Sequence, residues 1–138
     1  MQMFGLLLCA VCIACICMLH KSNVAAFSLG TGAWESALTN TLSPRDRIVS
    51  FQIGQFSLLW IDQQKRLNFN VDVIESDWGQ GANLNILASK LAEDAAHTIK
   101  AICIVHNETA TGVTNNLVKV RKLLGKCIYC DKGLAIIN

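Results

Sequence analysis

Proline is almost absent from this sequence, and charged and aromatic side chains are sparse. The 138 residues include a single proline, 9 glycines and 16% charged residues, with a net charge of +2. So few chain breakers favour packed elements over long linkers, and the length allows at most one domain. Lysine and arginine are scattered and form no basic stripe among aromatic residues, which argues against a nucleic-acid-binding protein.

The cysteines do not form the pattern of a disulfide-stabilised secreted domain. Their number is odd, at seven, and they are clustered: Cys9, Cys12, Cys15 and Cys17 in one apolar run, then Cys103, Cys127 and Cys130. We therefore expect reduced thiols. The first three have the spacing of a cluster-binding run, but apolar residues separate them and turn residues are missing, so we expect no metal site.

No charged or strongly polar side chain occurs from Met3 to Leu19. As a helix, about 17 residues span roughly 25 Å, the short limit for crossing a membrane. No basic residue precedes the run, and Val24-Ala25-Ala26 is a poor cleavage site. Three interpretations of residues 1–21 stay open: an apolar helix that anchors the chain in a membrane, a poor signal peptide of the secretory route, or an N-terminus unrelated to the domain that follows.

Strand-like runs alternate with helical patterns from residue 30 to residue 124. We expect strands at 47–53, 70–74 and 101–105, and helices at 34–42, at 58–67, after Asn83, and after Asn115 or Asn116. The run Ala-Ile-Cys-Ile-Val at 101–105 is typical of a strand buried on both faces of a parallel sheet. The alternation predicts an α/β fold with parallel strands. Residues 125–138 fit it less well and allow one more short strand.

Three segments are expected to meet beyond the carboxyl ends of these strands, where ligands bind in open α/β sheets. The first is the turn Gly30-Thr31-Gly32, whose glycines allow a close backbone approach and whose following helix favours an anion such as phosphate. The second is Gly54-Gln55-Phe56, and the third is the polar segment 106–112. Together they suit a flat, phosphorylated heteroaromatic ligand.

Three stretches of the chain closely resemble the serine–glyoxylate aminotransferases. They are Gly-Thr-Gly-Ala-Trp-Glu-Ser-Ala-Leu-Thr-Asn from residue 30, Arg-Ile-Val-Ser-Phe-Gln-Ile-Gly-Gln-Phe-Ser from residue 47, and Val-His-Asn-Glu-Thr-Ala-Thr-Gly-Val from residue 105. Those enzymes are class V aminotransferases that depend on pyridoxal 5'-phosphate, related to the alanine–glyoxylate aminotransferases. The resemblance covers residues 30–124 and implies part of the large domain of a fold-type I enzyme, normally a peroxisomal homodimer.

The resemblance also implies roles for individual residues. It places Gly30, Thr31 and Gly32 at the cofactor phosphate. Phe56 would stack on the pyridine ring, and Thr109 would hydrogen-bond near the phenolic oxygen of the cofactor. His106 and Glu108 receive no catalytic role, and Glu108 is expected to be structural.

The chain departs from the family pattern at several points. Leu29 replaces a usual threonine, and Arg45 replaces the glycine of a Ser-Pro-Gly-Asp turn. After Leu124 the family continues to an aspartate for the pyridinium nitrogen and to a Ser-x-Lys-Ala segment with the Schiff-base lysine, and neither segment is present here. The peroxisomal C-terminal tripeptide is also missing, since these residues end Ile-Ile-Asn.

Two hypotheses follow. The first is a fragment of a transaminase that moves an amino group from serine or alanine to glyoxylate, in photorespiratory or glycine metabolism, and that is inactive alone because its catalytic lysine is absent. Its parts would be an apolar segment (1–21), a partial aminotransferase domain (30–124) and a divergent tail (125–138). The alternative is a non-enzymatic fragment that is tethered to a membrane through residues 3–19 or competes for a full-length subunit.

Overall fold

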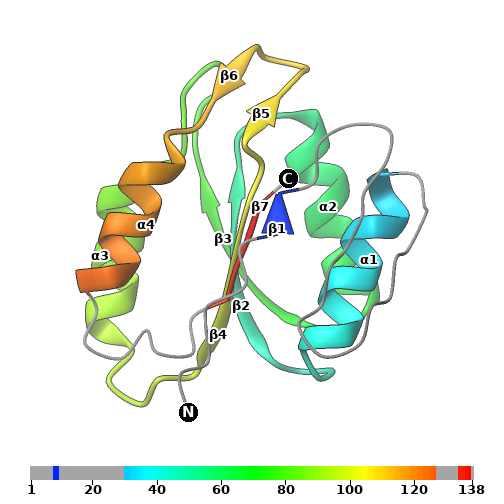
Figure 1. Cartoon of the computed structure of the whole chain (residues 1–138), viewed down its shortest axis with the longest axis vertical. Helices are drawn as coiled ribbons and strands as arrows, with labels where there is room; N and C mark the ends of the chain where they lie inside the picture. Colours follow the sequence, from blue (N-terminus) through cyan, green and yellow to red (C-terminus); the bar gives the residue numbers. More distant parts are fainter. Residues whose placement is uncertain (1–7, 10–29, 127–133, 138) are drawn as a thin grey trace.

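The computed structural model describes residues 8–9, 30–126 and 134–137, and it confirms the predicted α/β fold. One sheet of five parallel strands has the order β1-β7-β4-β2-β3. Helices α1 and α2 cover one face of the sheet, and α3 and α4 cover the other (Figure 1). The strands are β1 (Leu8–Cys9), β2 (Arg47–Gln52), β3 (Asn70–Glu75), β4 (Ile99–Ile104) and β7 (Leu134–Ile137), and the helices are α1 (Gly30–Thr41), α2 (Gln55–Arg66), α3 (Leu84–Glu93) and α4 (Leu117–Lys126).

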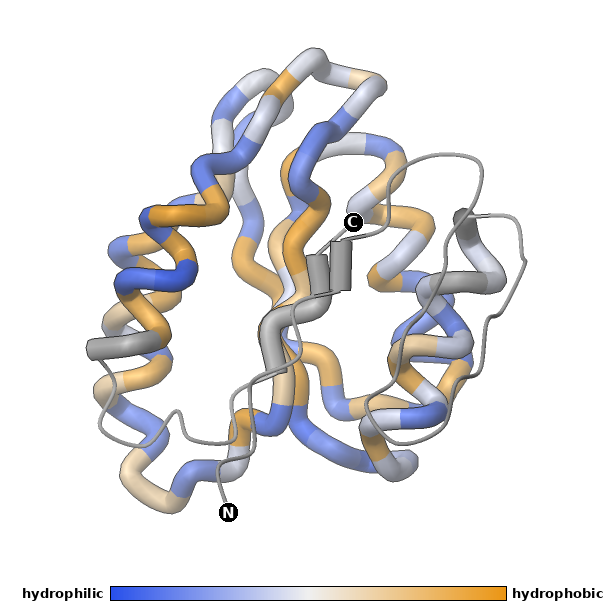
Figure 2. Tube along the Cα trace, viewed as in Figure 1, coloured by the Kyte–Doolittle hydropathy of each residue, from blue (hydrophilic) through white to orange (hydrophobic). Residues whose placement is uncertain are grey.

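The core lies between the sheet and the two helical layers. Strands β2 and β4 are buried over most of their length, and Figure 2 shows apolar residues along the strands. Trp34 of α1 and Trp60 of α2 stack with ring centroids 5.2 Å apart, which joins the two helices. Burial on both faces explains why residues 101–104 of β4 are a continuous apolar run rather than an alternating one.

Two helices begin earlier than the sequence predicts. We expected α1 to begin at Trp34 after a glycine turn, but Gly30, Thr31 and Gly32 are themselves its first turn. Glycine is tolerated there because the first four N–H groups of a helix have no partner within the helix. We expected α2 to begin near Leu58, but it begins at Gln55. The group that accepts hydrogen bonds from the first N–H groups of α2 lies in a distant part of the chain, as described below.

The ends of the described chain lie next to each other in the sheet. The predicted extra strand within residues 125–138 is present as β7, which pairs in parallel with β4. The apolar helix expected over residues 3–19 falls outside the described residues except for Leu8 and Cys9, which form β1 and pair with β7. Among the described helices, none is long and apolar enough to cross a lipid bilayer.

A short antiparallel hairpin follows β4, where the sequence suggested only a loop. Its strands are β5 (Asn107–Glu108) and β6 (Val113–Thr114), and Figure 1 shows it extending beyond the carboxyl ends of the main strands. Asn115 holds its base, because the side chain donates to Val105 O (2.6 Å) and accepts from Ala82 N (2.8 Å). The hairpin is thereby tied both to β4 and to the segment before α3.

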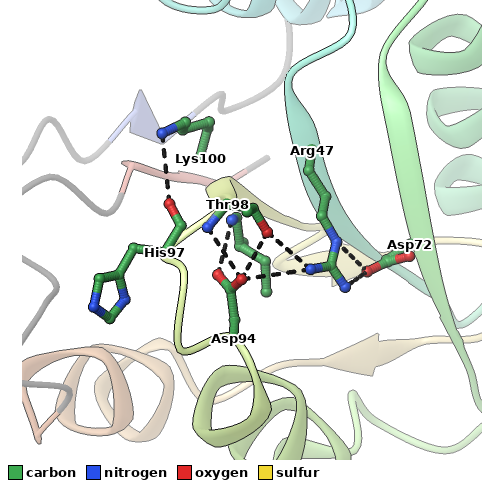
Figure 3. Close-up of polar contacts among 7 residues, drawn as sticks. Arg47, Asp72, Asp94, His97, Thr98 and Lys100 are labelled. Carbon is green, nitrogen blue, oxygen red and sulfur yellow. Dashed lines mark hydrogen bonds and ion pairs between the residues drawn. The ribbon is translucent and has the colours of Figure 1, made fainter.

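At the opposite end of the sheet, a polar network joins three segments (Figure 3). Arg47 of β2 forms an ion pair with Asp72 of β3 (2.6 Å) and a longer one with Asp94 after α3 (3.5 Å). Asp94 also accepts from the backbone and hydroxyl of Thr98 and from the backbone of Ile99. Burial acts to raise the pKa of Asp94, but these hydrogen bonds and the Arg47 charge outweigh it, so its pKa is lowered from 3.8.

Candidate functional site

The carboxyl group of Glu108 caps helix α2 from across the sheet. Residue 54, where a local N-cap side chain would be, is a glycine. Glu108 instead accepts from the backbone N–H of Ser57 (2.9 Å), of Phe56 (3.2 Å) and of Ala110 (3.4 Å). We call these three hydrogen bonds the Glu108 cap. The bonds from Phe56 and Ser57 satisfy two amides that an N-cap residue ordinarily satisfies, and they join α2 to β5.

Gly54 makes room for this carboxyl group. A Cβ at residue 54 would lie 2.5 Å from Glu108 Cγ and 2.6 Å from Cδ, closer than real Cβ atoms approach a neighbour. The backbone there is extended, with φ of 170°, so the glycine is required by space and not by its dihedral angle. Ser57 completes the turn, because its hydroxyl accepts from the N–H of Ile53 and of Gly54 at 2.9 Å each.

The Glu108 cap brings together the two residues that the resemblance places on the cofactor ring. Phe56 is 41% exposed, so part of its ring is open to a ligand. Thr109 is exposed, and its hydroxyl has no hydrogen-bond partner among the described residues. Phe56 donates its own N–H to Glu108, and Thr109 lies between Glu108 and Ala110, both part of the cap. These two predicted residues therefore flank one buried group.

The predicted phosphate-binding turn, Gly30 to Gly32 of α1, lies beside α2 at a point beyond Phe56. Thr31 O accepts a hydrogen bond of 2.9 Å from Gln63 Nε2, which places the first turn of α1 beside the second half of α2. Gln63 is seven residues, or roughly 10 Å, along the helix from Phe56. Since α1 leads by a short loop into β2 and runs antiparallel to it, Gly30, Thr31 and Gly32 lie at the carboxyl end of the sheet (Figure 1).

Helix N-termini at this edge differ in whether a side chain already occupies them. Glu108 occupies that of α2, Asn83 accepts from Asn85 N and Ile86 N at α3, and Asn116 accepts from Lys119 N at α4. Asn116, and not Asn115, is therefore the cap of α4. Among the described side chains, none accepts a hydrogen bond from the first turn of α1.

Two cavities at the same edge lie away from these residues. One, of about 610 Å³, is lined by residues between Gln52 and Asn83, including the exposed Trp78. The other, of about 520 Å³, lies between the first turns of α3 and α4. Neither is lined by Thr31, Phe56 or Thr109. Within the described chain, neither cavity thus coincides with the predicted cofactor residues.

The sequence predicted a cofactor contact for Thr109 but did not predict that the neighbouring Glu108 caps α2. Glu108 is fully buried, and it was expected only to be structural. A signal was present, because Gly54 sits where a helix usually has a capping side chain, and a missing local cap calls for an acceptor elsewhere. Asn115 was considered only as a helix cap, whereas it bridges β4 and the segment before α3.

The described fold is similar to part of solved aminotransferase structures. The structure matches alanine–glyoxylate aminotransferase from Nostoc sp. with a TM-score of 0.65 and 26% sequence identity, over 78% of this chain and 26% of that one. It also matches the aspartate aminotransferase of Thermus thermophilus, with a TM-score of 0.65 at 20% identity, which speaks for the fold alone.

The sequence comparison is more specific. The chain is 85% identical over 95 residues to serine–glyoxylate aminotransferase of Arabidopsis thaliana, and 52% identical over 95 residues to that of Methylorubrum extorquens. Each match covers 69% of this chain and 24% of the relative, so the chain spans about a quarter of the length of these relatives. No family model matches. The matched segment is a homologue of part of the serine–glyoxylate aminotransferases, which confirms the predicted resemblance.

Proposed function

We propose that the described chain forms one wall of a pyridoxal 5'-phosphate site in an enzyme that transfers an amino group from serine or alanine to glyoxylate. The observation that carries this proposal is the 85% identity to a serine–glyoxylate aminotransferase over 95 residues. The first turn of α1, Gly30 to Gly32, would hold the phosphate through its amides and Thr31. Phe56 would face the pyridine ring, and Thr109 would donate to the phenolic oxygen.

The residues present fit such a ligand. The amides of the first α1 turn suit a phosphate, an exposed aromatic ring suits a flat heterocycle, and an exposed hydroxyl without a described partner suits a phenolate oxygen. The bound cofactor supplies the electron sink for amino-group transfer. The chain's own residues would fix the position of the ring and donate hydrogen bonds to the phosphate.

Turnover requires more than this wall. By resemblance, the lysine that bonds to the cofactor and the acid at the pyridine nitrogen belong to parts of the relatives outside the matched quarter. We propose that the 138 residues alone bind the cofactor weakly and do not turn over, and that activity needs a homodimer or a full-length subunit. We assign the protein to a peroxisomal family by its relatives, and no observation favours the alternative of a membrane-tethered or subunit-competing fragment.

Binding of pyridoxine 5'-phosphate tests the proposed site, because this cofactor analogue lacks the aldehyde and cannot bond to surface lysines. We expect Phe56→Ala to weaken binding about tenfold through the lost ring contact. Leu59→Ala is the matched control, since Leu59 is a similarly exposed apolar residue of α2, 48% accessible. Equal binding by the Phe56 variant and the natural chain would contradict the role of Phe56, and no binding by the natural chain would contradict the site.

A further inference from the structure

Glu108 is buried without a charged partner. Its side chain is fully inaccessible, and none of the ion pairs among the described residues includes it. A buried carboxyl group needs compensation, and here backbone N–H groups at the start of α2 supply it. The positive end of the helix dipole and the hydrogen bonds act on the same group, so the helix start and the carboxyl group hold each other in place.

The Glu108 cap links two segments that lie far apart in the sequence, the first turn of α2 and β5. A serine or aspartate at residue 54 would cap α2 locally and leave the hairpin independent of it. With glycine at 54 and the acceptor at 108, the first turn of α2 cannot move without β5. Phe56 is in that turn and Thr109 is the residue after Glu108, so one carboxyl group fixes the separation of both.

We propose that Glu108 is a positioning residue that sets the placement of Phe56 relative to Thr109, and hence the position in which the cofactor ring would bind. This inference rests on the proposed function for its ligand. The claim about placement, however, concerns residues of this chain alone and is testable without any ligand.

The first experiment measures amide hydrogen exchange in the full chain without ligand. Glutamine at 108 has one acceptor oxygen and an NH₂ group that would face the N–H donors, so Glu108→Gln must break part of the cap. One oxygen accepts from Phe56 and Ala110 and the other from Ser57, so we expect either the Ser57 amide or the amides of Phe56 and Ala110 to exchange at least about tenfold faster. Asn83→Ala is the matched control, because it removes the cap of α3 on the other face of the sheet and should leave those amides unchanged.

Gly54→Ala provides a second variant that keeps the carboxyl group. Its new methyl group would displace Glu108 and loosen the same three amides. If either variant folds and these amides exchange as slowly as in the natural chain, the cap does not position α2 and the inference is wrong. A folded Glu108→Gln chain with fast exchange confined to this turn and to residue 110 supports it.

The second experiment compares two ligands in the same variants. Inorganic phosphate probes the first turn of α1, whereas pyridoxine 5'-phosphate also needs the ring seat. We expect Glu108→Gln to leave phosphate affinity unchanged and to weaken pyridoxine 5'-phosphate at least about tenfold, with an altered circular dichroism band for any ligand still bound. A general loss of stability would lower the affinity for both ligands, and Asn83→Ala should lower neither affinity.

The outcomes separate the two proposals. If the natural chain binds pyridoxine 5'-phosphate and Glu108→Gln binds it equally well, the positioning role is wrong and the site stands. If the natural chain binds neither ligand, the proposed function fails for this chain, and amide exchange alone decides whether Glu108 places Phe56. Selective loss of the ring-bearing ligand supports both proposals.

Discussion

Arg45 has a φ of 73°, in the left-handed region that L-amino acids with a side chain rarely adopt. It lies in the turn between α1 and β2, where its N–H donates to Asn68 O at 2.7 Å, so the turn is held in this shape. By the resemblance given above, a glycine is usual at this position. The Arg45 side chain therefore adds strain where the backbone requires a positive φ.

We expect Arg45→Gly to stabilise the chain by about 0.5–1 kcal/mol, the strain relieved less the entropy that glycine adds to the unfolded state. Arg45→Ala is the control, since it removes the charge and keeps a Cβ in the same backbone conformation. Urea denaturation followed by circular dichroism gives the free energy of unfolding of each. If Arg45→Ala raises the free energy of unfolding as much as Arg45→Gly does, the effect comes from removing the charge and the strain argument is contradicted.

Among the elements, the connection from α3 to β4 depends on Asp94. Asp94 is the C-cap residue of α3, where the helix dipole disfavours a negative charge. The amides of Thr98 and Ile99, the Thr98 hydroxyl and Arg47 offset that cost and hold the loop against the start of β2. One carboxylate thus joins the loop before β4 to the start of β2.

Asp94→Asn should lower the free energy of unfolding by about 1–2 kcal/mol near neutral pH, because an amide cannot accept every bond that the carboxylate accepts. The pKa of Asp94 is lowered by folding, so its charge stabilises the fold above its ordinary pKa of 3.8 and that stability is lost as the pH falls through the lower folded value. The difference between the variant and the natural chain should therefore shrink below pH 3.8, measured by urea denaturation across pH.

Asp62→Asn is the control for this prediction. Asp62 pairs with Arg66 on the surface of α2, and the two side chains are 58% and 79% exposed, so its loss should change stability by less than about 0.5 kcal/mol. An Asp94→Asn effect of the same small size, or one that does not depend on pH, would mean that Arg47 and Asp72 hold the sheet edge without Asp94.

The elements that follow local patterns were predictable, and those that depend on distant residues were not. The helix after Asn83 and the buried strand ending near residue 104 lie where apolar spacing and a capping residue placed them. The start of α2 was missed because its acceptor is Glu108, 51 residues after Ser57. The β5–β6 hairpin was missed because strands of two residues have no periodicity to detect. The cofactor residues came from family resemblance, and their roles stay predictions.

At the scale of the whole molecule, helices on both faces of one sheet should make residues 30–126 unfold together. Leu38 of α1 and Leu87 of α3 are both fully buried, on opposite faces of the sheet. The strands between them, β2 and β4, are shared by both layers. Loss of packing on one face should therefore lower the stability of the other.

We expect Leu87→Ala to lower the free energy of unfolding by about 2–5 kcal/mol, the usual cost of a cavity in a core. Tryptophan fluorescence reports largely on the stacked Trp34 and Trp60 of the opposite layer, and its midpoint should fall together with that of circular dichroism. Val118→Ala, at a side chain that is 63% exposed, should change stability by no more than about 0.5 kcal/mol. A fluorescence midpoint unmoved by Leu87→Ala would show that the two layers unfold separately.

During translation, α2 is synthesised well before Glu108, the residue that caps its first turn. At about 5–20 residues per second, the 51 positions from Ser57 to Glu108 take roughly 3–10 s to add. The caps of α3 and α4 are local, because Asn83 and Asn116 lie within three residues of the amides that they accept from. The turn that carries Phe56 is different: in the nascent chain it stays frayed until β5 has emerged and docked.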